Sequence, residues 1–166
     1  DNANQRAAVW QATDPDPGRV RYLTSQMGTG ELALSPDGAR LALAHRYDPG
    51  LLICDVKTAS VMHRLELPPR HSLAWSPDGR WLAASGSTTQ LWDTTSWESK
   101  TLPPSSPNHP PAGALAFAWP DKSGAVTLLA VAADNSRIAF ISLPRCEVAA
   151  VLTPPAELSL YRMAFS

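Results

Sequence analysis

Histidines and cysteines are the residues of this chain best suited to metal binding, and they are scattered along it. They are His45, His63, His71, His109, Cys54 and Cys146. A zinc site needs several such side chains at short, regular spacing. Because each of these residues stands apart from the others in the sequence, we predict no metal site.

Nucleophilic catalysis and phosphate binding also need local patterns. A hydrolase serine often stands in a Gly-x-Ser-x-Gly turn, which this sequence does not contain. The stretch Gly28-Thr29-Gly30 is too short for a phosphate-binding loop and precedes an apolar run. We therefore expect no catalytic residue, no cofactor and no enzymatic activity.

The composition favours one domain made of short strands and turns. The chain has 166 residues, of which 44% are hydrophobic and 17% charged, and 16 are prolines. A net charge of −1 provides no basic surface for nucleic acid or for an anionic membrane. No run approaches the roughly 18 apolar residues of a membrane span. The expected partners therefore exclude nucleic acid and membrane.

Cysteine content and the first residues bear on location. We interpret Cys54 and Cys146 as buried free thiols, which favours a reducing compartment. The first ten residues, DNANQRAAVW, lack the apolar core of a secretion signal. A cytoplasmic location is the expectation.

One stretch of the sequence occurs twice in nearly the same form. SLAWSPDGRWLAASG at 72–86 nearly repeats LALSPDGARLALAHR at 32–46, and in both an apolar run stops at Ser-Pro-Asp-Gly before a second run. This pattern predicts two strands joined by a tight turn, with proline at the first corner and glycine in the left-handed conformation. The predicted turn residues are Ser35, Pro36, Asp37, Gly38, Ser76, Pro77, Asp78 and Gly79.

Two further copies extend the repeat. ALAFAWPDKSG places Trp119 at the serine position, followed by Pro120 and Asp121, and YRMAFS ends on Ser166. The turn positions recur about every 41 to 47 residues, a period typical of propeller blades with several strands each. A second landmark is the end of the third strand, at Cys54 and Asp55, at Trp92 and Asp93, and at Ile141 and Ser142.

A strand that ends in Ser-Pro-Asp-Gly and a later strand that ends in Trp-Asp together resemble the WD-repeat family. The resemblance implies an all-β fold, a β-propeller of the WD-repeat type. We expect an N-terminal strand d and a long loop at 1–30, in which residues 15–30 form either an extended surface loop or an extra strand around Arg19 to Thr24. Three complete four-stranded blades would follow at 31–67, 68–102 and 113–152, and a C-terminal strand a at 157–166.

Three blades and two single strands do not close a ring. We therefore expect an arc of a larger propeller, because a propeller is stable when each blade packs between neighbours. The missing blades would come from additional polypeptide, from a second copy or from a partner chain. A four-bladed ring with a rudimentary last blade is the alternative.

The resemblance also implies a polar pair inside one blade. His109 has the family's spacing before the third turn, and Asp134 falls in the expected turn between the second and third strands. They would form a structural His–Asp pair, which orients a loop and catalyses nothing.

Tryptophans and loop residues are the candidates for partner contacts. We expect Trp75, Trp92 and Trp119 in the core, and Trp10 and Trp97 on outer strands, where tryptophan often dominates binding. Residues of the connecting loops would add a polar rim: Arg19, Arg21, Tyr22 and Arg70.

The function implied by the resemblance is a noncatalytic scaffold or sensor that binds a protein or peptide. Degenerate bacterial repeats of this composition are often attached to signalling proteins such as protein kinases or sensor ATPases. The alternative is an accessory or gating propeller of a hydrolase, similar to TolB-like or prolyl-oligopeptidase-like domains. The Trp92 and Asp93 dipeptide favours the scaffold.

Overall fold

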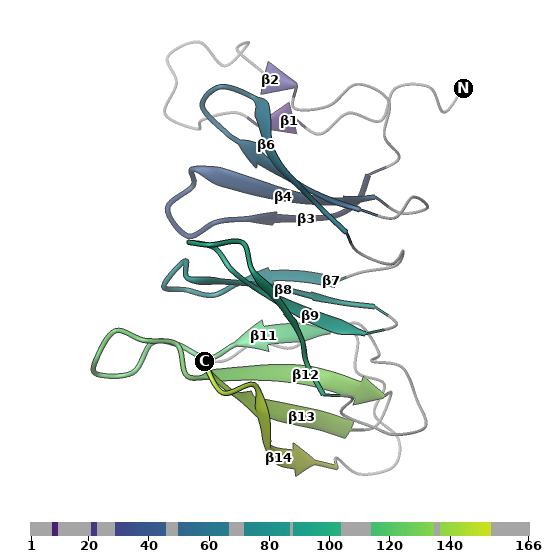
Figure 1. Ribbon diagram of the computed structural model, residues 1–166, viewed down its shortest axis with the longest axis vertical. Helices are drawn as coiled ribbons and strands as arrows, with labels where there is room; N and C mark the ends of the chain where they lie inside the picture. Colours follow the sequence, from purple (N-terminus) through teal and green to yellow (C-terminus); the bar gives the residue numbers. More distant parts are fainter. Residues whose placement is uncertain are drawn as a thin grey trace.

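The computed structural model describes residues 8–9, 21–22, 29–45, 50–66, 72–86, 88–103, 114–134 and 137–153. Within these ranges the regular structure consists of β-strands, which form three four-stranded antiparallel sheets and one two-stranded sheet. Figure 1 shows the three larger sheets stacked one on another in chain order along the long axis. The predicted all-β fold is confirmed.

Each four-stranded sheet is one blade, with its strands side by side in chain order. Blade 1 contains β3 (Thr29–Leu34), β4 (Arg40–His45), β5 (Leu51–Asp55) and β6 (Ser60–Leu65). Blade 2 contains β7 (Ser72–Trp75), β8 (Trp81–Ser85), β9 (Thr89–Asp93) and β10 (Ser99–Thr101). Blade 3 contains β11 (Leu115–Phe117), β12 (Leu128–Asp134), β13 (Arg137–Ser142) and β14 (Glu147–Leu152). We call these strands a to d of their blade.

The two-stranded sheet lies at the blade 1 end of the arc (Figure 1). It pairs β1 (Ala8–Val9) with β2 (Arg21–Tyr22) in antiparallel fashion. β1 falls within the segment predicted as strand d, and β2 falls where an extra strand was expected. The predicted strand at 157–166 lies outside the described residues.

The strand register makes the three blades comparable residue by residue. The last residue of each strand a faces a partner on strand b: Leu34 pairs with Leu41, Trp75 with Leu82, and Phe117 with Leu129. Because directly opposed residues project to the same side of a sheet, Leu34, Trp75 and Phe117 occupy equivalent places. The same counting relates Leu32, Leu73 and Leu115.

Each blade has two unlike faces at its inner strands. We call the face toward the preceding blade the leading face and the face toward the following blade the trailing face. Alanines 33, 42 and 44 of blade 1 pack against leucines 73 and 82 of blade 2, together with its Trp75. Alanines 74 and 83 of blade 2 pack in the same way against Leu115, Phe117 and Leu129 of blade 3. At these positions large leading residues fit small trailing residues, which gives a close-packed seam. Trp81 on the trailing side and Ala84 on the leading side of blade 2 depart from this pattern.

The two outer faces of the arc differ from each other. On the leading face of blade 1, residues of strands b and c form a buried cluster, whereas Leu32 and Leu34 of strand a are 49% and 52% exposed. On the trailing face of blade 3, Ala116, Ala130 and Ala132 are buried. The exposed inner strand is therefore β3.

Candidate protein-interaction surface

The a–b turns of blades 1 and 2 have the same hydrogen-bonded frame. The Ser35 hydroxyl donates to Asp37 Oδ1 at 2.6 Å and accepts from the Arg40 N–H at 2.9 Å. Asp37 Oδ1 also accepts the Ala39 N–H at 3.0 Å. Pro36 stands at the first corner of this turn, and Gly38 has a left-handed φ of 70°. The side chains of Ser35 and Asp37 thus hold the neighbouring backbone in place.

Blade 2 repeats this frame at Ser76, Pro77, Asp78 and Gly79. The Ser76 hydroxyl donates to Asp78 Oδ1 at 2.5 Å and accepts the Trp81 N–H at 2.8 Å, and Gly79 has a φ of 72°. The second oxygen of Asp78 has an additional role, because it accepts the Val126 N–H of blade 3 at 3.0 Å. This turn therefore ties two blades together.

The third a–b connection is longer than the other two. The Ala118 N–H donates to the Leu128 carbonyl at 3.0 Å, as the Ser35 N–H does to Arg40 at 2.9 Å. Ala118 therefore takes the place of the turn serine, and the alignment of Trp119 with that serine was wrong by one residue. Pro120 and Asp121 lie in an extended loop, residues 118–127. In Figure 1 this loop, between β11 and β12, projects beyond the other turns at its end of the arc.

The 118–127 loop is cross-linked within itself. Asp121 Oδ1 accepts the Ser123 N–H at 2.8 Å and the Ser123 hydroxyl at 2.5 Å. The Gly124 N–H donates to the Asp121 carbonyl at 2.9 Å. Trp119, which the sequence placed in the core, is 62% exposed on this loop. Trp119 thus lies largely exposed on a loop that is cross-linked by its own hydrogen bonds.

The strand c ends lead into a second set of braced turns. Asp55 Oδ1 accepts both the N–H and the hydroxyl of Thr58, at 2.6 and 2.8 Å, and Asp93 Oδ1 accepts the Thr95 N–H at 2.9 Å. The preceding residues, Cys54 and Trp92, are buried. Each of these Asp residues therefore closes a turn at the end of a buried strand.

The c–d turns share an uncommon backbone conformation. The residue four places after the strand c end has a left-handed φ in every blade, 57° at Ala59, 60° at Trp97 and 62° at Cys146. A left-handed residue after a tight turn realigns the strands of a hairpin. Side chains other than glycine therefore occupy a position that glycine prefers.

Local hydrogen bonds lower the pKa of four turn carboxylates. For Asp37 and Asp121 the main cause is a serine hydroxyl, and for Asp55 and Asp93 it is a threonine backbone N–H. The Arg80 guanidinium adds to the effect on Asp93, with its Nε 3.6 Å from Asp93 Oδ2. These carboxylates are ionised at neutral pH and committed to their turns.

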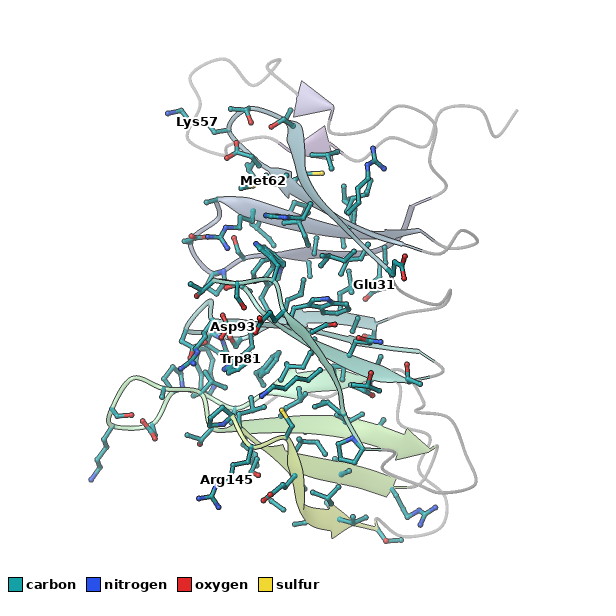
Figure 2. The ribbon with its side chains drawn as sticks, in the orientation of Figure 1. Glu31, Lys57, Met62, Trp81, Asp93 and Arg145 are labelled. Atoms are coloured by element: carbon teal, nitrogen blue, oxygen red, sulfur yellow. The ribbon has the colours of Figure 1, made fainter. Side chains whose placement is uncertain are left out.

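Polar links cross the seam between blades 1 and 2. The Trp75 indole N–H donates to the Ala33 carbonyl at 2.9 Å, and Arg40 Nη1 donates to the Thr94 carbonyl at 3.3 Å. Within blade 2, Arg80 Cζ lies 5.0 Å from the centroid of the Trp81 ring, near the a–b and c–d turns, where Figure 2 labels Trp81 and Asp93. The first two of these contacts therefore join blade 1 to blade 2.

Trp97 lies at the same seam. Its ring centroid is 4.7 Å from that of His63 on blade 1 and 6.3 Å from that of Trp75, which it meets edge-on. Trp97 is half-buried and comes just before β10, not within it. Much of its ring therefore contacts the neighbouring blade, and a smaller part faces solvent.

Several of the predicted functional residues belong to parts of the chain that the structure does not describe. Trp10, Arg19, Arg70 and His109 lie outside the described residues. Arg21 and Tyr22 form β2, and Asp134 ends β12, where it pairs with Arg137 in the sheet register. The proposed His109–Asp134 pair therefore stays a prediction.

Burial affects the pKa of both cysteine thiols. Cys54 is buried and Cys146 is partly buried, both are free, and burial raises the pKa of each. Both thiols are therefore protonated at neutral pH.

Metal sites and membrane-spanning helices are features of other function classes. Among the residues that the structure describes, no group of three or more His, Cys, Asp or Glu side chains could hold a metal ion. Within those same ranges, no helix is long and apolar enough to span a bilayer.

The chain matches no protein-family model and no curated protein sequence. Its fold, however, is similar to solved structures. U3-55K is 17% identical, with a TM-score of 0.63 over 85% of this chain and 43% of that one. The WD40 repeats of RRP9 are 16% identical, with a TM-score of 0.64 over 85% of this chain and 43% of that one. Hydrazine synthase of Kuenenia stuttgartiensis is 15% identical, with a TM-score of 0.63 over 81% of this chain and 39% of that one.

The chain spans about two fifths of the length of these structures. At such low identity the likeness establishes the fold, and it agrees with the stacked four-stranded sheets and the matched seams. The predicted fold class is confirmed: the three blades are an arc of a β-propeller of the kind that WD40 repeats form.

Proposed function

We propose that this arc is a noncatalytic scaffold that binds a protein partner at the end where the a–b and c–d turns lie, with Trp119 as a principal contact. The observation that carries the proposal is the 118–127 loop, which is longer than its counterparts and carries Trp119, a residue that is 62% exposed. Tryptophan is enriched among the residues that dominate protein interfaces. Its exposure on a braced loop is therefore best accounted for by recognition.

Binding should cost the 118–127 loop little conformational entropy, because hydrogen bonds already hold its base and its tip. Val126, at its base, is buried in the seam with blade 2, and its N–H donates to Asp78. The tip is closed by the bonds from Ser123 to Asp121. A contact residue held in this way loses less freedom when a partner docks.

Crosslinking in cells of the natural source tests the proposal. A photoreactive amino acid replaces Lys122, an exposed residue three positions after Trp119 on the same loop, and the same probe at Thr95 on an exposed turn of blade 2 serves as the control. We expect a specific protein adduct at position 122 that is lost when Trp119→Ala is added. Adducts that persist with Trp119→Ala, or that form equally at position 95, would argue against this surface.

The wider setting is part of the same proposal. The length relative to the similar structures supports an arc within a larger propeller, and we place that propeller in a signalling protein. The free thiols support a reducing compartment, the cytoplasm.

An enzyme-associated propeller is the second candidate. The similar structure from Kuenenia stuttgartiensis carries the name of an enzyme, hydrazine synthase, so this fold also occurs in such proteins. Sequencing the reading frame around this segment separates the two candidates. A kinase or sensor ATPase domain would favour the scaffold, and a hydrolase domain with its nucleophile turn would favour the gate.

A further inference from the structure

The two carboxylate oxygens of Asp78 accept hydrogen bonds from different blades. Oδ1 accepts the Ser76 hydroxyl at 2.5 Å and the Arg80 N–H at 3.1 Å, both within the a–b turn of blade 2. Oδ2 accepts the Val126 N–H of blade 3 at 3.0 Å. Asp37, at the same turn position of blade 1, also accepts a serine hydroxyl and a backbone N–H on Oδ1. In the part of the chain that the structure describes, however, no hydrogen bond from blade 2 reaches Asp37.

The peptide group between Ala125 and Val126 is hydrogen-bonded on both sides. Its N–H donates to Asp78 Oδ2, and its carbonyl, that of Ala125, accepts the Asp121 N–H at 2.9 Å. Because a peptide group is planar, a bond that fixes the N–H direction also fixes the carbonyl direction. A charged acceptor on the N–H also polarises the group and strengthens the bond at its carbonyl. Asp78 therefore acts on the 118–127 loop through this one peptide group.

Asp121 connects this constraint to Trp119. Pro120 is the single residue between them, and its ring fixes its own φ. On the other side of Trp119, the Ala118 N–H donates to the Leu128 carbonyl at 3.0 Å. The backbone of Trp119 thus lies between two hydrogen-bonded points, and one of them depends on Asp78.

Burial makes the Asp78 bond difficult to replace with water. Val126 is 3% exposed and packs in the core between blades 2 and 3 with Phe117 and Leu129. A buried N–H that loses its acceptor is destabilising, so the backbone moves until the group is satisfied again. Loss of the carboxylate should therefore change the conformation of the loop as well as its stability.

We propose that Asp78 is a positioning residue for Trp119: the a–b turn of blade 2 sets the conformation of the blade 3 loop that carries it. The proposal deepens the scaffold function and rests on it, because it makes the recognition surface a joint product of two blades. A partner that contacts Trp119 should then depend on Asp78 without touching it.

Asp78→Asn is the test variant, and Asp37→Asn is its matched control. All three groups bonded to the Asp78 carboxylate are donors, so an amide of the same shape cannot accept from all of them. The two donors of the turn keep the amide oxygen, which leaves the amide NH₂ against the Val126 N–H. Asp37→Asn makes the same change in a turn without the bond between blades.

Two measurements on the whole chain need no partner. The chain is labelled with 5-fluorotryptophan, and Trp119→Phe identifies the ¹⁹F resonance of Trp119. We expect Asp78→Asn to shift or broaden this resonance and Asp37→Asn to leave it unchanged. The Val126 amide should exchange with solvent about tenfold faster or more in Asp78→Asn, and within about twofold of the unmodified chain in Asp37→Asn.

Crosslinking connects the positioning role to binding. The yield of the adduct from the probe at position 122 should fall at least about fivefold with Asp78→Asn and persist with Asp37→Asn. An unchanged yield with Asp78→Asn would overturn the positioning role. If no adduct forms even in the unmodified chain, the scaffold proposal fails, while the resonance and exchange measurements still test whether Asp78 positions the loop.

Two results without a partner would also overturn the proposal. One is a Trp119 resonance and a Val126 exchange rate that respond equally to Asp78→Asn and Asp37→Asn. The other is a Val126 amide that exchanges in the unmodified chain as fast as an unstructured amide, a result that does not require either variant to fold. Circular dichroism of both variants confirms that they remain folded.

Discussion

Equivalent leucines at a covered and an open position should differ sharply in their contribution to stability. We expect Leu73→Ala to destabilise the chain by about 3 kcal/mol, because a buried leucine loses its transfer free energy and leaves a cavity. Leu73 is 8% exposed and lies in the core between blades 1 and 2. Leu32, its counterpart on blade 1, is 49% exposed.

The expected effect of Leu32→Ala is about 1 kcal/mol. Fully burying a leucine stabilises by roughly 1.5 to 3 kcal/mol, and about half of this side chain is buried. Solvent fills the space that the side chain vacates, so no cavity contribution is added. The two substitutions should therefore differ by about 2 kcal/mol, or about 4 to 8 °C in Tm for a chain of this size.

Urea denaturation followed by tryptophan fluorescence measures both values. The slope of the transition should stay the same in the two variants, so that the midpoints report stability. Equal destabilisation by the two substitutions would refute the reasoning, because it would mean that β3 is covered in solution. An effect of Leu73→Ala below about 1 kcal/mol would show that the seam between blades 1 and 2 is not packed as described.

Three further predictions concern the turns and the seam. Gly38→Ala should destabilise the chain by about 1 kcal/mol because of its φ of 70°; a Cβ there meets nothing within 4 Å, so the cost comes from the backbone alone. Ala59→Gly, at a φ of 57°, should stabilise the chain by about 0.5 kcal/mol. Urea midpoints that move in the same direction in both variants would contradict this. Trp75→Phe should remove about 1 kcal/mol, because the indole bond to the Ala33 carbonyl is lost, and an unchanged urea midpoint would show that this bond is unimportant. Lowered pKa values in the folded state mean that the turn carboxylates stabilise the fold above the ordinary aspartate pKa of 3.8 and lose this effect as pH falls below it. Urea midpoints should therefore hold between neutral pH and about pH 5 and drop by pH 3, and a midpoint at pH 3 equal to that at pH 6 would count against the turn hydrogen bonds. The carboxylates concerned are Asp37, Asp55, Asp93 and Asp121.

The strands and turns were predictable because their determinants are local. Ser-Pro-Asp-Gly specifies its own turn, since the hydroxyl of Ser35, the carboxylate of Asp37 and the φ of Gly38 act within five residues. The alternation of leucine and alanine in LALSPDGARLALAH also predicts leucines on one face of blade 1 and alanines on the other, and the strand register agrees. How deeply each face is buried depends on the neighbouring blade, and the local sequence pattern carries no information about that blade.

The tryptophans show where sequence reasoning failed. Trp119 was expected in the core because Trp-Pro-Asp resembles Ser-Pro-Asp, yet the backbone pairing gives that place to Ala118 and extends the loop. Trp97 was expected on an outer strand, but it stacks on His63 of another blade, a contact between residues far apart in the sequence. Both cases depend on how strands pair or blades stack, so a single sequence does not determine them.

The unlike faces of each blade also bear on how such proteins change size. A duplicated blade inserted between blades 2 and 3 would meet leucines with alanines on one side and alanines with leucines on the other. The new boundary between the two copies of blade 2 would still have to accommodate Trp81, which is buried on the trailing side of that blade. Gene duplication could therefore add a whole repeat with most of the inner-strand contacts already matched in size.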